Sequence, residues 1–279
     1  MGSRSQKEKA TYFRQLHRGP EMLVLPNIWD AASARIIEQA GFPAIATTSS
    51  GLAAALGYSD GQHLSRELLI EALARITRVV EGPVTADIEA GFGNSIAEVV
   101  QTVKEVISAG VVGINIEDSP KQGQKALLDI AYQVELIQAL RELATTLDVP
   151  FVINARTDVL LLGIGEPEGR FAHTVQRANA YLQAGADCVY PIGYFDQELI
   201  ANLVKAINGP VNIMGSSSGP TLPELERLGV ARVSLAGGVM RSILGHLRAI
   251  AQELREHGTY TKMSSAELAG AEFRTLFSD

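Results

Sequence analysis

Residues 183–191 read Gln-Ala-Gly-Ala-Asp-Cys-Val-Tyr-Pro, in which a glycine precedes a short apolar segment. Glycine adopts the left-handed conformation that ends a helix, so Gly185 predicts a helix end followed at once by a buried strand. The same arrangement occurs three more times, with Gly41 before Ala44-Ile45, Gly110 before Gly113-Ile114, and Gly229 before Arg232-Val233. Four copies of one helix-to-strand turn predict a repeated βα unit.

Eight short apolar segments rich in β-branched residues are each typical of a buried strand. They are Met22–Ile28, Ala44–Ser49, Val84–Glu89, Gly113–Asp118, Phe151–Asp158, Cys188–Gly193, Val211–Gly215 and Arg232–Gly237. Segments with apolar residues at helical spacing lie between them, and these are Leu64–Val80, Ile96–Ala109, Ala126–Leu147, Ala172–Ala184 and Val239–Glu253. Strand and helix therefore alternate along the chain.

Eight βα units in a chain of this length favour an α/β fold of the closed (β/α)8 TIM-barrel type, because closure leaves no exposed sheet edge. A doubly wound open sheet is the alternative. A further helix is expected around Thr11–Arg18, and a tail follows from His257 to Asp279. No Pro/Ser-rich linker divides the chain, so we expect one domain over residues 1–279.

Composition excludes several classes of protein. The 279 residues are 46% hydrophobic, and 24 Lys+Arg against 31 Asp+Glu give a net charge of −7 without a basic run, so nucleic acid is not an expected partner. A single cysteine, Cys188, suits a reducing compartment, and we expect a cytoplasmic protein. No apolar stretch reaches 18 residues and the polar start lacks a signal peptide, so no membrane role is expected.

Acidic side chains end two neighbouring predicted strands, where a barrel places its catalytic groups. Asp87 and Glu89 share one face of strand three, and Glu117 ends strand four. Carboxylates without nearby Cys or clustered His suit a hard cation, so we predict Mg²⁺, with Mn²⁺ as the alternative ion. The competing interpretation is a buried network in which these carboxylates pair with Arg156, or caps of the following helices.

Arg156, which shares a face of strand five with Asn154 and Asp158, is predicted to bind an acidic substrate through its planar guanidinium. The small residues after strand two let the backbone N–H groups of Ser50, Gly51 and Leu52 approach an anion. We also assign Asn212 to substrate binding. The Gly-Ser tract 215–219 lies where many barrels bind phosphate, and plain flexibility explains it equally well.

The remaining reactive residue types give no site pattern. Cys188 falls inside an apolar strand, which predicts a buried thiol. Packing or surface roles are expected for the five histidines, which are His17, His63, His173, His246 and His257.

Several short motifs follow one another along the chain: Ser50-Gly51-Leu52, Leu56-Gly57 with Asp60, Asp87-Ile88-Glu89-Ala90-Gly91-Phe92-Gly93-Asn94, Ile116-Glu117-Asp118, Pro120-Lys121, Asn154-Ala155-Arg156 and Gly185-Ala186-Asp187. Together and in this order, they resemble the motifs of the isocitrate lyase and phosphoenolpyruvate mutase superfamily over roughly Leu25 to Leu254, nearest to its oxaloacetate decarboxylase-like members.

The resemblance implies a Mg²⁺-dependent enzyme that acts on a small 2-oxo or 2-hydroxy carboxylate through an enolate. It implies that Asp87 binds the metal directly and that Asp60, Glu89 and Glu117 hold the metal's waters. It implies that Ser50, Gly51 and Leu52 bind the substrate carboxylate or oxyanion and that Arg156 binds its other oxygens. It also implies a homotetramer, a dimer of dimers in which paired subunits exchange the eighth helix, from Val239 onward.

The loop after strand four departs from the lyase pattern. It reads Pro120-Lys121-Gln122-Gly123-Gln124, without the Cys and His that the lyases carry there. Loss of CO₂ from a β-oxo acid needs no general acid for the leaving group, so we favour decarboxylation of oxaloacetate or a similar oxo diacid, with Arg156, Glu117 and Lys121 in catalysis.

Four alternatives stay open. They are a C–C lyase acting on a substituted malate or citrate-like acid, a phosphonate mutase or hydrolase, a non-catalytic barrel that binds an oxo acid, and a metal-free phosphate-binding barrel that uses residues 215–219.

Overall fold

Each of the eight predicted segments contains a β-strand in the computed structural model, which describes residues 4–120, 125–265 and 267–277. The first segment forms two short strands, β1 (Leu23–Leu25) and β2 (Asn27–Ile28), on either side of Pro26, which has no N–H to donate. The others are β3 (Ile45–Thr47), β4 (Val84–Asp87), β5 (Gly113–Glu117), β6 (Val152–Thr157), β7 (Cys188–Pro191), β8 (Asn212–Met214) and β9 (Arg232–Ser234).

The strands close into a barrel. One sheet has the order β1-β9-β8 and the other the order β2-β3-β4-β5-β6-β7, and all pairs are parallel. The chain itself joins β1 to β2, and a bridge between Val189 and Val211 joins β7 to the start of β8. The prediction of a (β/α)8 barrel is confirmed, and the open doubly wound sheet is excluded.

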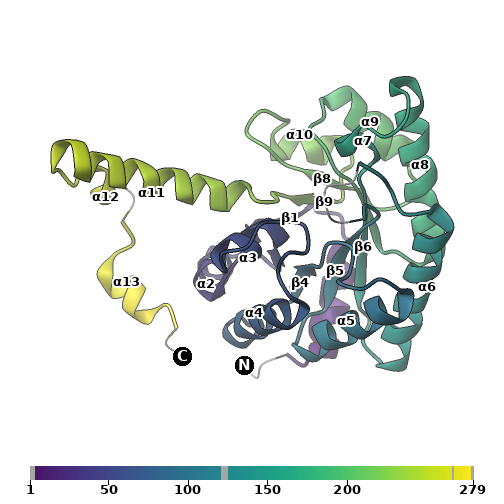
Figure 1. Ribbon diagram of the computed structural model, residues 1–279, viewed down its shortest axis with the longest axis horizontal. Helices are drawn as coiled ribbons and strands as arrows, with labels where there is room; N and C mark the ends of the chain where they lie inside the picture. Colours follow the sequence, from purple (N-terminus) through teal and green to yellow (C-terminus); the bar gives the residue numbers. More distant parts are fainter. Residues whose placement is uncertain (1–3, 121–124, 266, 278–279) are drawn as a thin grey trace.

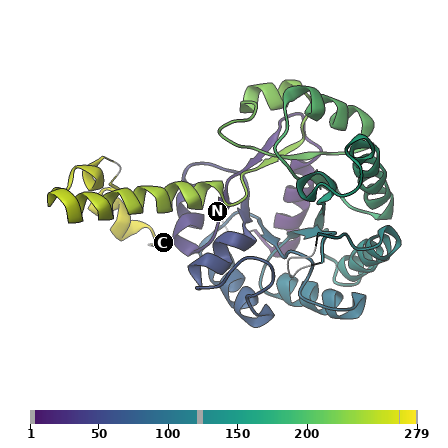
Figure 2. The same cartoon turned by 45° about the horizontal axis from the view of Figure 1, so that its top comes forward.

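Helices surround the strands, as the ring in Figure 2 shows. The four glycines of the repeated turn have positive φ angles, from 82° at Gly229 to 112° at Gly185, as predicted. The helices are α1 (Gln6–Leu16), α2 (Ala31–Gln39), α3 (Ser49–Ala55), α4 (Arg66–Val79), α5 (Ile96–Ser108), α6 (Ile130–Thr146), α7 (Val159–Leu162), α8 (Pro167–Ala184), α9 (Gln197–Ala206), α10 (Leu222–Arg227), α11 (Gly238–His257), α12 (Thr261–Ser264) and α13 (Gly270–Thr275).

Helix α1 closes the end of the barrel at which the strands begin. Phe13 of α1 is fully buried and packs with Leu23, Leu25 and Val152, which face the barrel interior. A Cβ atom at Gly113 would lie 2.8 Å from the Phe13 ring, so the close approach of α1 requires a glycine there. With this end filled, the opposite end, where the strands finish, is where a ligand can enter.

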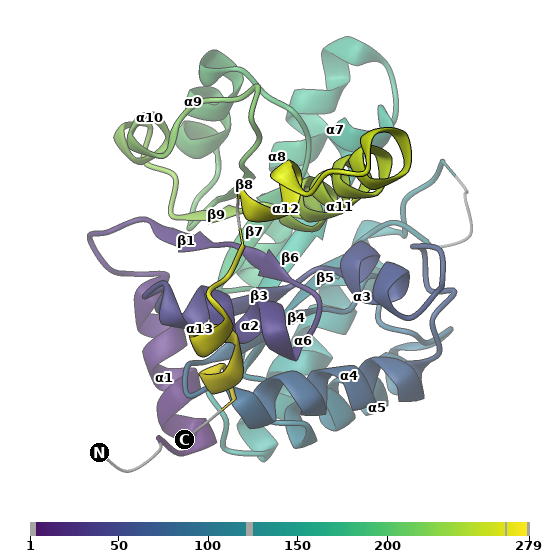
Figure 3. The same cartoon turned by 90° about the vertical axis from the view of Figure 1, so that its left-hand side faces the viewer.

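Helix α11 projects away from the barrel instead of lying against it (Figure 1). Only Met240 and Glu253 of its residues are buried. The tail then turns back, so that α13 lies near α2 (Figure 3), where Arg35 Nε donates a 3.0 Å hydrogen bond to Leu276 O. Within the described residues, no helix has the length and apolar character needed to cross a membrane.

Candidate active site

Backbone strain gathers at the ends of the strands. Among the described residues, five that are not glycine have φ in the left-handed region. Glu89, Phe92 and Ala236 are three of them and lie in loops that follow strands, and a fourth, Gln62, contacts Glu89. Such conformations are costly and persist where the surrounding structure holds them in place, often at functional sites. Here Gln62 N donates to the Glu89 carboxylate at 3.0 Å, and Phe92 N donates to Gln62 Oε1 at 2.6 Å.

Asp87 and Glu89 lie at and just after the end of β4, at the barrel mouth. Asp87 ends β4 and is partly exposed, and its Oδ2 accepts from Ser49 N at 3.0 Å. Its Oδ1 lies 3.3 Å from Glu89 N, which is a weaker contact. Glu89 is almost fully buried, and its backbone O accepts from Glu117 N at 2.9 Å. Asp87, Glu89 and Glu117 therefore lie at or just after the ends of the paired strands β4 and β5, and they are called the acidic group below.

Arg156 is the cation of this site, and two carboxylates hold it. Its Nε and Nη2 donate to Asp158 at 2.6 and 3.1 Å, and its Nη1 lies 2.9 Å from Glu117 Oε2. Burial works against the charge of Arg156, but Glu117 and Asp158 outweigh it and raise the pKa of the guanidinium. Arg156, which was predicted to bind substrate, thus also forms the buried ion pair with Glu117 that the competing interpretation proposed.

Ser119 is a site residue that the sequence analysis did not identify. Its Oγ lies 2.8 Å from Glu117 Oε1 and 2.7 Å from Asp158 Oδ2. One hydroxyl carries one hydrogen, so it donates to a single carboxylate at a time. The only signal in the sequence was a hydroxyl residue two positions after a buried carboxylate at a strand end.

Asp118, between Glu117 and Ser119, points outward and fixes the backbone of the site. It is fully buried, and its Oδ2 accepts from Tyr181 OH at 2.8 Å and from Arg177 Nη1 at 3.1 Å, both on α8. Its Oδ1 accepts from Asp158 N at 3.0 Å. Burial raises the pKa of Asp118 in spite of these hydrogen bonds. Asp118 therefore ties the ends of β5 and β6 to helix α8.

The segment Ser50-Gly51-Leu52 lies in helix α3, directly after the residue that bonds Asp87. Leu52 N donates to Thr48 O at 3.0 Å, and its side chain belongs to the core, so its amide is already used. Among the described residues, no acceptor is recorded for the amides of Ser50 and Gly51. A side chain at Gly51 would collide with Thr48 Cγ2 at 2.6 Å, so glycine is required here.

Three predicted site residues lie outside these contacts. Asp60 is exposed on the loop that follows α3, two residues from Gln62. Asn212 is fully buried at the start of β8, where its Nδ2 donates to Ser234 Oγ at 3.1 Å, and no recorded contact joins it to Asp87, Glu117 or Arg156. Lys121 lies outside the described residues.

Cys188 is a buried free thiol, as predicted, and burial raises its pKa to about 12. His17 is buried below the barrel, where its ring meets that of Phe13 edge-on at a centroid distance of 4.7 Å. His173 accepts a hydrogen bond from Arg177 Nε at 2.9 Å. Both histidines therefore have packing roles.

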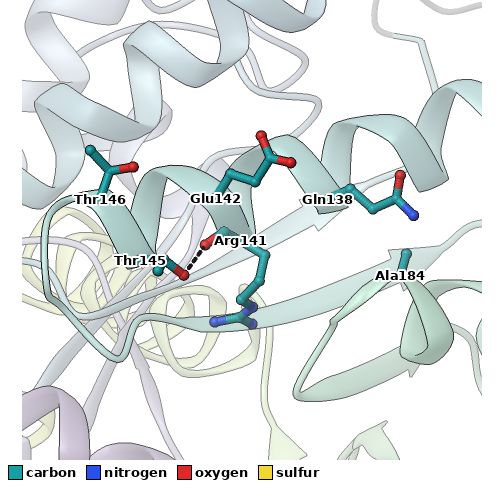
Figure 4. A pocket seen from close by; sticks show the side chains of 6 residues that line it. All are labelled: Gln138, Arg141, Glu142, Thr145, Thr146 and Ala184. Carbon is teal, nitrogen blue, oxygen red and sulfur yellow. Dashed lines mark hydrogen bonds between the residues drawn. The ribbon is translucent and has the colours of Figure 1, made fainter.

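Two hollows on the surface differ in their relation to the site. One, of about 610 Å³, opens beside the Gln62–Glu89 contact and is lined by residues that include Phe92, Pro120 and Tyr132. The other, of about 790 Å³, lies on the outside of α6, and Figure 4 shows its side chains around Arg141, whose O accepts from Thr145 Oγ1 at 2.9 Å. The second hollow contains none of the strand-end residues.

The acidic group fits a hydrated Mg²⁺ ion. In the part of the chain that the structure describes, no three His, Cys, Asp or Glu side chains are close enough to surround one ion. Mg²⁺ is commonly held by only one or two carboxylates and keeps several waters. Asp87 is partly exposed, and Glu89 and Glu117 belong to the ends of the same pair of strands, so one direct ligand with the other carboxylates acting through water is compatible with these residues.

Comparisons with known proteins cover nearly the whole barrel. A family model described as phosphoenolpyruvate phosphomutase matches residues 13–255. The chain is 31% identical to 2-methylisocitrate lyase of Escherichia coli (strain K12), over 82% of this chain and 79% of the relative. It is 33% identical to 2,3-dimethylmalate lyase of Eubacterium barkeri, over 79% of this chain and 77% of the relative.

A solved structure is similar over the full length. It is a protein of Burkholderia cenocepacia J2315 provisionally named a lyase/mutase, and it matches with a TM-score of 0.89 and 35% identity, covering 98% of this chain and 97% of that one.

Proposed function

This chain belongs to the phosphoenolpyruvate phosphomutase family, in the phosphoenolpyruvate mutase/isocitrate lyase superfamily of enzymes, and from that premise we propose that it is a Mg²⁺-dependent lyase. The substrate is a small 2-oxo carboxylate, and the first reaction we assign is decarboxylation of oxaloacetate or a similar oxo diacid. The observation that carries this proposal is Arg156, a planar cation held by Glu117 and Asp158 beside the acidic strand ends.

Substrate binding uses donors that the protein leaves available. A guanidinium has five N–H bonds, and the contacts of Arg156 with Asp158 and Glu117 use three of them. The two that remain donate to the 2-oxo oxygen of the substrate. The amides of Ser50 and Gly51 donate to its carboxylate. Asp158 and Glu117 keep Arg156 fixed, so little side-chain entropy is lost on binding.

The bond change needs an electron sink and no acid for the leaving group. The C–C bond to the departing carboxylate breaks, its electron pair moves toward the 2-oxo oxygen, and CO₂ leaves. Arg156 stabilises the negative charge that develops on that oxygen. A proton then returns to the carbon of the enolate, and Lys121 or a water supplies it.

Asp87 would hold Mg²⁺ directly, and Glu89, Glu117 and Asp60 would hold it through water. When bound, the ion supplies positive charge that stabilises an enolate beside Arg156. Bound Mg²⁺ would also offset part of the negative charge of these carboxylates.

A second candidate reaction is C–C cleavage of a substituted malate or citrate-like acid. The names of the two relatives at 31% and 33% identity, 2-methylisocitrate lyase and 2,3-dimethylmalate lyase, favour it. The loop sequence Lys121-Gln122-Gly123-Gln124 has no thiol, so another group would have to act as the acid or base. Its product would be glyoxylate or a longer 2-oxo acid. A phosphonate mutase or hydrolase is the third candidate.

The test is turnover of oxaloacetate to pyruvate by the purified protein with Mg²⁺, measured against the metal-only background. We expect turnover that EDTA abolishes, because the acidic group loses its ion. Asp87→Ala should lower kcat/KM about 100-fold or more, since the direct metal ligand is gone. Asp148→Ala is the matched control, because this acid lies on the surface beside Lys7.

Background rates alone would remove decarboxylation from the assignment. The same reactions on a panel of C3 to C6 oxo and hydroxy diacids, followed by mass spectrometry, would then identify a C–C lyase by its 2-oxo acid product. Release of phosphate from a phosphonate would identify the third candidate. Thermal stabilisation by oxalate without any turnover would indicate a binding protein.

We further propose a homotetramer, a dimer of dimers in which helix α11 packs on a neighbouring subunit. The support is the projecting position of α11 and its exposed apolar residues, which include Ile243 and Leu247.

A further inference from the structure

Arg232 places a full positive charge inside the barrel. It begins β9, it is fully buried, and it is among the largest buried side chains. Its Nη2 donates to Asn115 Oδ1 at 3.2 Å, its Nε donates to Ser234 Oγ at 3.3 Å, and its Nη1 lies 3.4 Å from His17 Nε2. All of these partners are neutral. Within the described residues, no carboxylate lies at ion-pair distance from Arg232.

The charge lies close to the barrel axis. β9 is the eighth strand of the barrel and β5 is the fourth, so they stand on opposite sides, and the contact from Arg232 to Asn115 crosses the interior. Asn115 pairs in register with Asp87, and Glu117 is two residues farther along the same face of β5. Through Asn115, the guanidinium therefore lies level with Asp87 and one layer below Glu117.

A buried charge without a counter-ion is unfavourable, so its nearest opposite charges matter. Burial lowers the pKa of Arg232, and Cys188, Tyr190 and then Asp87 partly offset this effect; Asp87 is the carboxylate among them. Arginine nevertheless remains protonated at any ordinary pH. Arg232 is fully buried, so its interaction with charges at the mouth is screened less than an interaction between two exposed charges.

We infer that Arg232 is the internal counter-charge of the acidic mouth and sets how strongly the mouth binds a divalent cation relative to an organic anion. This inference rests on the proposed function. Arg232 does not touch the substrate, so it acts through its charge and not as a catalytic residue. Its positive charge opposes a divalent cation and favours an organic anion. The ion therefore binds weakly by itself and more tightly when the anionic substrate is present to offset the charge of Arg232.

The test measures binding of two probes separately, Mn²⁺ alone and oxalate alone, by isothermal titration calorimetry. Arg232→Gln removes the charge and keeps a polar side chain. We expect this variant to bind Mn²⁺ about tenfold more tightly and oxalate about tenfold more weakly. An effect of this size corresponds to a charge–charge interaction at an effective dielectric constant between that of water and that of a protein interior. Arg232→Lys keeps the charge and loses the planar contacts, so both affinities should stay within about threefold of wild type.

A purely structural role predicts a different result. It would shift both affinities of Arg232→Gln in one direction or leave both unchanged, and Arg232→Lys would behave as Arg232→Gln does. Either result overturns the inference. Arg141→Gln is the control, because Arg141 is a partly buried arginine that bonds Asp187 on the outside of the barrel, away from the mouth. It should change the thermal midpoint without moving the two affinities in opposite directions.

A second variant covers the case in which Arg232→Gln does not fold. Asn115→Asp places a carboxylate where the amide oxygen now lies 3.2 Å from Arg232, so it neutralises the charge without removing the side chain. It should shift both affinities as Arg232→Gln does, and unchanged affinities would contradict the inference. If wild type binds neither Mn²⁺ nor oxalate, the proposed function itself fails.

Discussion

His17 shows how a single residue can report on the closed end of the barrel. Its Nδ1 lies 2.9 Å from Phe13 O, which can only accept, so Nδ1 carries the hydrogen and Nε2 faces Arg232. Burial, followed by the charge of Arg232, lowers the pKa of His17 to about 4. The ring is therefore neutral in the folded protein throughout the physiological pH range.

This pKa predicts a pH dependence of stability. The unfolded chain takes up the proton near pH 6.5, before the folded chain does, so the stabilisation is complete above pH 6.5 and is lost as the pH falls toward 4. Moving from pH 7.5 to pH 5 should lower the free energy of unfolding by about 2 kcal/mol through this residue. Urea unfolding at the two pH values measures it.

His17→Gln should have less of this pH dependence than wild type, whereas His257→Gln, on the exposed end of α11, should keep it. Equal pH dependence in wild type and His17→Gln would show that other groups cause it.

Several site residues could be predicted because they obey the alternation of a strand. Asp87, Glu117 and Arg156 face the interior near the ends of their strands, and a period of two places them there. Ser119 and Arg232 were not predicted as site residues. The first acts through a loop whose path no periodicity specifies, and the second lies at a strand start, where a long side chain reaches a distant strand.

At the scale of elements, the repeated glycine turn allowed the order of strands and helices to be predicted. Helix ends were predicted less well, and α8 begins at Pro167 rather than Ala172, because proline is well tolerated in the first turn of a helix. The split of the first strand at Pro26 was also missed. The left-handed conformation of Glu89 could not be predicted, since the contact with Gln62 that supports it joins two separate loops.

Helix α1 makes a test at this scale possible. Phe13→Ala should lower the free energy of unfolding by about 3–5 kcal/mol, because it empties a fully buried position between α1 and the strand starts. Chemical denaturation of the variant and wild type checks this. Gln15→Ala, on the exposed face of the same helix, should cost little. A small loss in Phe13→Ala would mean that α1 does not seal the barrel.

At the scale of the whole molecule, helix α11 carries an exposed apolar stripe. Ile243, Leu247 and Leu254 are 55%, 58% and 41% exposed, and their spacing places them on one side of the helix. Contiguous exposed apolar surface commonly marks an interface between proteins.

The stripe predicts how the proposed tetramer can be dissociated. The double variant Ile243→Lys/Leu247→Lys should reduce the native molar mass in light scattering after size exclusion, while circular dichroism stays unchanged because both side chains are already exposed in the single chain. Gln252→Lys, an exposed polar position of α11, is the control. An unchanged molar mass would exclude this face of α11 from the assembly.

The closed barrel consists of two arcs, one of three strands and one of six, that meet at two seams. One seam follows the break at Pro26, and a single bridge between Val189 and Val211 spans the other. Few backbone hydrogen bonds join the two sheets at either seam, so side-chain hydrogen bonds have to connect them. Arg232 connects them across the barrel interior by donating to Asn115, and Asn27 connects them by accepting a hydrogen bond from Leu235 N at 2.7 Å. Loss of either hydrogen bond would therefore favour local opening of the barrel where the two sheets meet.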